Sequence, residues 1–291
     1  MTTLPLSGTA PLRAVDPRPA SAEDGVEESV HVFAGNLVGV LTQPPGGTRA
    51  RAALVLLNAG LTHRMGPFRL YVQMARVLAA QGFTVFRFDQ SGLGDSALST
   101  QVTAGRVMAE TTAAMDLVTS LTGVREFVLG GLCSGANDAF NIAPADARVA
   151  GLLLLDGVGY RTPGYHLRHY LPRLLRPASI WGYFRRRLGP PRDTPPPELD
   201  DFSDFPTRAE AARRLEALDA RGVQALLLYT GGVGDYYNHR SQARACFGAV
   251  MRSPGMATDY WPECDHTFYL RAHREKLFHA VSQWMLARFG A

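Results

Sequence analysis

Short apolar runs, separated by segments of helical periodicity, limit what this chain can fold into more than any other feature. Three of them are Ala52–Leu57, Phe127–Gly130 and Val149–Leu155. Such runs are typical of strands that are buried on both faces, as in a parallel sheet. Apolar residues recur at helical spacing between them, for example in 68–81 and 103–121. The alternation predicts right-handed βαβ units, and therefore an α/β fold with a twisted, mostly parallel sheet of about eight strands flanked by helices.

The strand rhythm also predicts how the chain is divided. A chain of 291 residues can bury one large core, or one core with an inserted subdomain. Residues 1–27 are rich in Pro, Ala, Ser and acidic residues and lack periodicity, which predicts a flexible arm. The rhythm breaks over 157–221, where we expect a helical cap above the carboxyl edge of the sheet. The core is then expected to comprise 28–156 and 222–291.

A glycine-framed pentapeptide, Gly131-Leu132-Cys133-Ser134-Gly135, follows the second of the apolar runs and precedes a predicted helix. A tight Gly-x-X-x-Gly turn between a strand and a helix is the setting of a nucleophile elbow. The apex residue of such a turn has a strained backbone, and larger neighbours would collide with it. The register places Cys133 at the apex. The alternatives are a tight turn around an inert cysteine and, against the register of the glycines, Ser134 as the nucleophile.

Two polar residues downstream occupy positions that suit the partners of such a nucleophile. Asp235 lies shortly after the predicted strand 223–230, and His266 follows the last predicted strand, 257–261. The carboxyl ends of parallel strands meet at one edge of the sheet, which is where open α/β sheets bind ligands. The chain order nucleophile, acid, histidine is that of the α/β-hydrolase triad.

The chemistry explains why these three residue types belong together. A thiol is mostly protonated at neutral pH, and an imidazole within hydrogen-bond reach converts it to the reactive thiolate. A carboxylate holds the imidazole in one tautomer and stabilises the imidazolium. We therefore predict a catalytic triad of Cys133, Asp235 and His266. Asp156, at the end of the strand 149–155, is the rival for the role of the acid.

The loop after the first apolar run is expected to complete an oxyanion hole. It occupies the position that supplies the second backbone donor in α/β-hydrolases. We expect the donors to be the backbone N–H groups of Leu61 and Ser134. His63 and Arg64 in the same loop are candidates for binding substrate, with packing within the loop or exposure to solvent as equal alternatives.

Composition excludes several other classes. A formal net charge of +4 is modest, so the whole molecule does not resemble a nucleic-acid-binding protein. Three cysteines give no disulfide framework, and a working thiol suits a reducing compartment. We find no signal peptide and no apolar run near the ~20 residues that span a membrane, so a soluble, cytoplasmic protein is expected. No zinc-ligand spacing and no dinucleotide fingerprint occurs, so we expect neither a metal nor a cofactor.

On these motifs the chain resembles the α/β-hydrolase superfamily from about residue 28 onward. Within it, the chain is similar to hydrolases associated with exosortase systems and to related thioesterase-like proteins of bacterial biosynthetic clusters. Those relatives also carry cysteine at the elbow, and the resemblance implies an acyl-transfer enzyme. The segments that carry it are Leu54–Pro67, Phe86–Ser96, Gly131–Ala136, His169–Leu188 and Asp265–Phe268.

The leading functional hypothesis is acyl transfer through a Cys133 acyl-enzyme, with an ester or thioester as the donor. Water, an amine or an alcohol could accept the acyl group, in a bacterial pathway that makes a natural product or an exopolysaccharide. The arginine-rich stretch within 165–188 is either a solvated face or a surface for an acidic partner such as an acyl carrier protein. The alternatives are a non-catalytic binding protein with this fold and a hydrolase of small esters or lactones.

Overall fold

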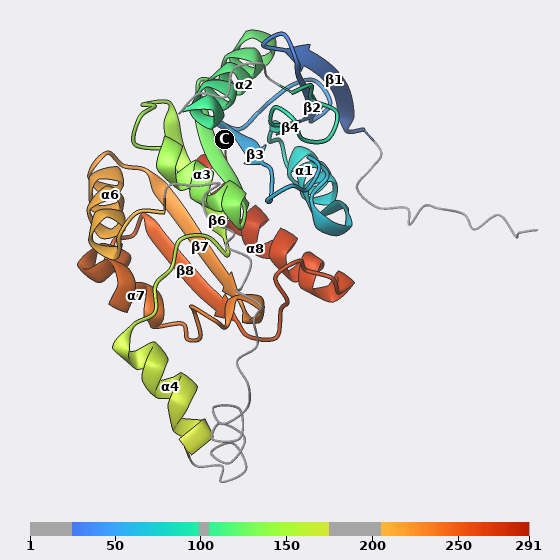
Figure 1. Ribbon diagram of the computed structural model, residues 1–291. Helices are drawn as coiled ribbons and strands as arrows, with labels where there is room; N and C mark the ends of the chain where they lie inside the picture. Colours follow the sequence, from blue (N-terminus) through green and yellow to red (C-terminus); the bar gives the residue numbers. More distant parts are fainter. Residues whose placement is uncertain (1–24, 99–104, 175–204, 291) are drawn as a thin grey trace, which may run out of the picture.

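A computed structural model describes residues 25–98, 105–174 and 205–290 of the chain (Figure 1). Its centre is a single eight-stranded sheet with the strand order β1-β2-β4-β3-β5-β6-β7-β8. This confirms the predicted fold class. The strands are β1 (Glu27–Phe33), β2 (Leu37–Gln43), β3 (Ala52–Leu57), β4 (Val85–Asp89), β5 (Glu126–Leu132), β6 (Val149–Leu155), β7 (Gln224–Thr230) and β8 (Met256–Trp261).

The sheet is antiparallel only at its β1 edge. Strand β1 pairs antiparallel with β2, and β2 pairs antiparallel with β4. All other pairings, from β4 and β3 through to β8, are parallel. The carboxyl ends of β3 to β8 therefore lie along one edge, as βαβ connections require.

Helices cover both faces of the sheet, and Figure 1 shows α1 and α8 grouped apart from α2, α3, α6 and α7. The α-helices are α1 (Leu70–Ala79), α2 (Arg106–Thr122), α3 (Ser134–Ile142), α4 (Pro163–Leu174), α6 (Arg208–Ala220), α7 (Gln242–Phe247) and α8 (Arg271–Phe289). The 3-10 helices are η1 (Pro67–Arg69), η2 (Gly231–Val233) and η3 (Gly248–Arg252).

Strand β3 shows why its apolar run is unbroken. Ala53, Val55 and Leu57 point into the core under α2, α3, α6 and α7. The alternate residues of β3 point into the second core, under α1 and α8. Because a strand sends successive side chains to opposite faces, a strand between two cores needs apolar residues at every position.

The region expected to form the cap divides into two parts. Helix α4 extends away from the layered body in Figure 1. Helix α6 instead packs on the sheet and buries Ala211, Leu215 and Leu218 in the core. The expected insertion 157–221 therefore includes a helix of the core layer. Most of the arginine-rich stretch lies outside the described residues, as does nearly all of the expected arm.

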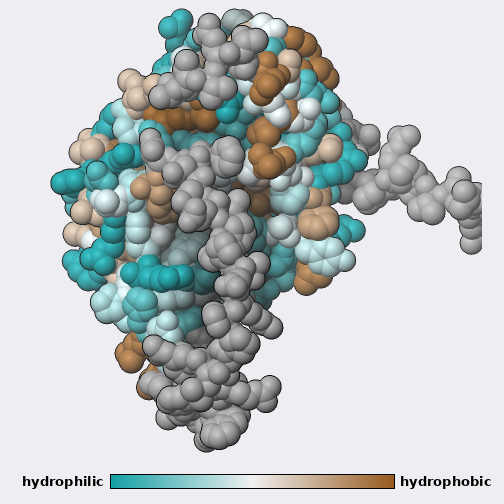
Figure 2. All heavy atoms as spheres, viewed as in Figure 1, coloured by the Kyte–Doolittle hydropathy of each residue, from teal (hydrophilic) through white to brown (hydrophobic). Residues whose placement is uncertain are grey.

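The described surface is mixed. Figure 2 shows apolar residues in groups between hydrophilic ones. No helix among the described residues has the length and apolar character needed to cross a membrane.

Candidate active site

The turn between β5 and α3 has the strained geometry expected of a nucleophile elbow. Cys133 lies at its apex with φ 58° and ψ −119°, in a region that side-chain-bearing residues rarely adopt. A Cβ atom on Gly135 would lie 2.7 Å from the carbonyl oxygen of Leu57. One on Gly131 would lie 2.8 Å from the backbone carbon of Gly135. The two glycines are therefore required for the turn to fit against β3.

A buried carboxylate holds the imidazole beside this thiol. His266 Nδ1 lies 2.8 Å from Asp156 Oδ2. Asp156 directly follows β6, is 3% exposed and has a positive φ of 50°. The backbone N–H and the hydroxyl of Thr230, at the end of β7, donate to its two oxygens at 2.6 and 2.7 Å. The carboxylate is thus fixed by β7 while it orients the ring.

Asp235 does not occupy the position predicted for it. It is exposed, and its described contacts run through its backbone carbonyl, which accepts from Arg161 Nε at 2.7 Å and from the Tyr165 hydroxyl at 2.6 Å. The 3-10 turn η2 separates it from the end of β7. The acid that meets His266 is the rival candidate, Asp156. Its strand lies directly beside β5 in the sheet, whereas β7 is one strand further from the elbow.

Hydrogen bonds link the three side chains, and these contacts change the pKa values of His266 and Cys133. Hydrogen bonds to Asp156 and then to Cys133 raise the pKa of His266 to about 10. In turn the hydrogen bond from His266 lowers the pKa of the Cys133 thiol, against the opposing effect of its partial burial. An imidazolium beside a thiolate is the arrangement that activates a cysteine nucleophile.

The other two cysteines have the opposite environment. Cys246 and Cys264 are buried, whereas Cys133 is exposed. Burial raises the pKa of both thiols, that of Cys264 to about 11. Buried, protonated thiols of this kind are inert. Of the three thiols, Cys133 therefore has the environment that suits a nucleophile.

The loop after β3 reaches the elbow through Gly60. The Gly60 N–H donates to the Ser134 hydroxyl at 2.6 Å, so this glycine, which the sequence analysis did not single out, is the loop residue that contacts the elbow. Ser134 also donates its backbone N–H to the sulfur of Cys133. The Ser134 hydroxyl accepts a hydrogen bond from Gly60, whereas the Cys133 side chain is the one that forms a hydrogen bond with His266. Leu61, the next residue of the loop, remains a predicted oxyanion donor.

His63 and Arg64 bind the loop and the turn after β4. The Arg64 guanidinium forms ion pairs with the buried Asp89 and, at 2.7 Å, with Asp95. Among the described residues, His63, Asp89 and Asp95 are the group with metal-ligand atoms close together, within 4.8 Å of one another. Arg64 already supplies the positive charge that the two carboxylates need. The cluster is therefore a clamp that fixes the loop, and it does not suit a metal ion.

Two further residues, which sequence reasoning missed, contact the segments that carry His266 and Asp156. A Cβ atom on Gly232 would lie 2.3 Å from the backbone nitrogen of His266, so only glycine lets the histidine loop approach β7. The Tyr236 hydroxyl donates to the backbone carbonyls of Asp156 and Gly157 at 2.9 and 3.2 Å. The pair of glycines after the strand was the sequence signal that could have indicated Gly232. No sequence pattern indicates the contact made by Tyr236.

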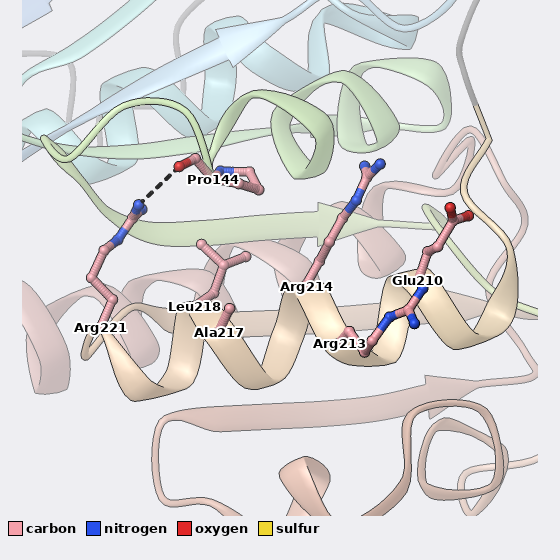
Figure 3. Close-up of a pocket in the computed structure, with 7 residues that line it drawn as sticks. All are labelled: Pro144, Glu210, Arg213, Arg214, Ala217, Leu218 and Arg221. Atoms are coloured by element: carbon pink, nitrogen blue, oxygen red, sulfur yellow. Dashed lines mark hydrogen bonds between the residues drawn. The ribbon is translucent and has the colours of Figure 1, made fainter.

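A hollow of about 360 Å³ lies elsewhere, between α6 and the end of α3 (Figure 3). Its arginines tie these helices together. Arg214 donates to Asn141 Oδ1 at 2.8 Å, and Arg221 donates to the carbonyls of Ala143 and Pro144 at 2.7 and 3.3 Å. None of the triad residues lines it. We interpret the hollow as part of the packing contact between α6 and α3 and not as a substrate site.

The fold recurs in solved structures of α/β hydrolases. An esterase from Pyrococcus furiosus aligns with a TM-score of 0.57 at 11% identity, covering 91% of each chain. The esterase domain of a Rhodothermus marinus protein aligns with a TM-score of 0.55 at 16% identity, covering 91% of this chain and 100% of that one. A dienelactone hydrolase from Anabaena variabilis aligns with a TM-score of 0.52 at 14% identity, covering 91% and 99%.

No family model and no curated protein sequence matches the chain. At these identities the similarities establish the α/β-hydrolase fold. What the chain does must be argued from its own site.

Proposed function

We propose that this protein cleaves acyl esters or thioesters through a covalent thioester on Cys133, with His266 as the general base and acid and Asp156 as its orienting carboxylate. The observation that carries the proposal is the aligned chain from the elbow thiol through His266 to the buried Asp156 carboxylate. That the similar structures include two esterases supports the reaction class.

In the acylation step, His266 holds the proton of the Cys133 thiol, and the thiolate attacks the acyl carbonyl carbon. The carbon–sulfur bond forms while negative charge moves onto the carbonyl oxygen. Backbone N–H groups at the start of α3 and in the loop after β3 are suited to stabilise that charge. Each such donor contributes about 100- to 1,000-fold to the rate of related enzymes. The bond to the leaving group then breaks as the imidazolium gives it a proton.

Deacylation uses the same histidine in reverse. His266 removes a proton from water, the oxygen attacks the thioester carbonyl, and the Cys133 thiolate leaves. An amine or alcohol acceptor would follow the same steps and give an amide or ester in place of an acid. Thioesters react readily with amines, so acyl transfer is the second candidate reaction.

Intact-protein mass spectrometry tests the proposal most directly. Wild type and Cys133→Ala would be incubated with p-nitrophenyl esters and alkyl acyl thioesters, with and without a primary amine. We expect an acyl adduct or steady turnover on wild type alone. Product analysis separates acid from amide and so distinguishes hydrolysis from transfer.

Two results would count against this function. Turnover or an adduct that persists in Cys133→Ala would transfer the nucleophile role to another group. The absence of both across the whole panel would favour the non-catalytic binding protein. A carrier-bound donor, and the exosortase-type pathway that the resemblance implies, would be tested by replacing the small thioesters with acyl carrier protein thioesters.

A further inference from the structure

Five large apolar side chains are exposed on the two loops that also carry the site. Leu61 and Met65 lie on the loop after β3, Phe68 lies in η1 directly beyond it, and Tyr269 and Leu270 lie on the loop before α8. Their exposed fractions run from 42% for Met65 to 80% for Leu61. Soluble proteins rarely leave several large apolar residues exposed in one place unless the surface binds something. We call these five residues the rim.

The backbone is strained where the rim residues are presented. Phe68 and the adjoining Arg69 have φ values of 49° and 60°, and Phe268, which precedes Tyr269, has 53°. Residues other than glycine rarely adopt such conformations, which persist where the surrounding structure imposes them. Two rings presented by these segments meet: the centroids of Phe68 and Tyr269 are 5.1 Å apart in an edge-to-face contact.

Polar contacts hold both loops in place. The Asp265 carboxylate accepts from the Tyr269 N–H at 3.0 Å, and Arg274 Nη1 donates to the carbonyls of Phe268 and Tyr269 at 2.9 and 2.7 Å. The other loop is clamped by Arg64, whose backbone N–H donates to Asp89 Oδ1 at 2.5 Å. The rim is thus a preformed surface, which lowers the entropic cost of binding.

The two segments that carry the rim also carry groups of the site. Leu61 directly follows Gly60, which contacts the elbow, and Tyr269 is three residues beyond His266. We infer that the rim binds the apolar acyl chain of the substrate, and therefore that the natural donor carries a medium or long alkyl or aryl acyl group. This inference rests on the proposed function.

The chemistry of the site indicates which end of the substrate meets the rim. His266 must protonate the leaving group, so the leaving group lies toward the imidazole. The carbonyl oxygen lies toward the N–H donors of the elbow and of the loop after β3. The acyl chain then extends away from the imidazole, and three of the five rim residues lie between β3 and α1, on the side of the loop that carries these donors.

Acyl-chain selectivity tests the inference. Values of kcat/KM would be measured for p-nitrophenyl esters from acetyl to octanoyl on wild type and on the double variant Phe68→Ala/Tyr269→Ala. Complete burial of one methylene should raise kcat/KM about fourfold, so partial burial on an open surface should raise kcat/KM about twofold per methylene. We expect the octanoyl-to-acetyl ratio to fall at least tenfold in the double variant.

A matched control is available on α8, the helix that follows the loop carrying Tyr269. Leu286 of α8 is also 42% exposed, and it lies about 22 Å along the helix from Arg271 at 1.5 Å per residue. Leu286→Ala should keep the wild-type length profile.

The possible results distinguish failure of the inference about the rim from failure of the proposed function. Cys133-dependent turnover with a flat length profile, or with equal losses on all esters in the double variant, would overturn the role of the rim and leave the function intact. A dependence on the length of the alcohol, measured with alkyl acetates, would assign the rim to the leaving group and also overturn the inference. No turnover and no adduct on Cys133 for any ester would overturn both.

Discussion

Replacing Asp156 by Asn tests the arrangement of the site more sharply than any other change. The substitution keeps the size of the side chain and an oxygen that can accept from Thr230. It removes the negative charge that meets His266 Nδ1 at 2.8 Å. Asp235→Asn is the matched control, because Asp235 is the acid predicted from the sequence and is exposed, without a hydrogen bond to His266 among the described contacts.

The magnitude follows from the contact that is lost. A hydrogen bond to a charged group contributes about 1.5–3 kcal/mol. If that contribution is made in the transition state, its loss lowers kcat by about 10- to 150-fold. In another triad, Asp→Asn costs about 10,000-fold, because the imidazole also takes the wrong tautomer. We therefore expect kcat to fall at least tenfold in Asp156→Asn and to change less than twofold in Asp235→Asn.

The assay combines turnover with a measurement that needs no natural substrate. Hydrolysis of a p-nitrophenyl ester gives kcat, and iodoacetamide alkylation followed by mass spectrometry gives the reactivity of Cys133. Alkylation at pH 7 should slow in Asp156→Asn, because the His266 pKa, raised to about 10 chiefly by this carboxylate, falls and the thiolate loses its imidazolium partner. Thermal unfolding of each variant checks that the protein remains folded.

Asp156 is not the orienting acid if the two variants exchange behaviour. A large loss in Asp235→Asn, with Asp156→Asn near wild type while both remain folded, would mean that Asp235, the acid predicted from the sequence, acts in solution. Equal activity of all three proteins would mean that no carboxylate orients the histidine.

Three other predictions follow from the same geometry. Iodoacetamide should label Cys133 and spare the two buried thiols, and labelling of the buried thiols at comparable rates would contradict this. The pH midpoint of Cys133 labelling should lie below the ordinary thiol pKa and should rise toward it in His266→Ala. In the same ester assay, Gly232→Ala should lower kcat by at least ~10-fold, because the new Cβ atom would lie 2.3 Å from the backbone nitrogen of His266. The control Gly234→Ala should be close to wild type, because the atom nearest to its new Cβ lies 3.3 Å away. Arg64→Met should reduce the free energy of unfolding in urea by about 3 kcal/mol, because it leaves the buried Asp89 carboxylate at the end of β4 without the Arg64 cation. An unchanged urea midpoint would show that this ion pair does not stabilise the protein.

The sequence by itself determined the layers of this fold. Apolar residues at every position of β3 and most of β6 require cores on both faces, and helical spacing between strands requires parallel crossovers. The elbow could also be predicted, because the steric need for Gly131 and Gly135 is local. The distance between them in sequence fixes Cys133 at the apex whatever the rest of the chain does.

Only the tertiary structure decided which groups meet at that apex. Asp156 and Asp235 both follow buried strands, and chain order is the same for either. The choice depends on strand order in the sheet, which sets β6 beside β5, and on the turn η2, which carries Asp235 away from the histidine. The contact from Gly60 to Ser134, the glycine beneath His266 and the edge-to-face rings of the rim likewise join segments far apart in the chain. Local patterns specify local conformations, whereas such contacts depend on how the whole sheet is assembled.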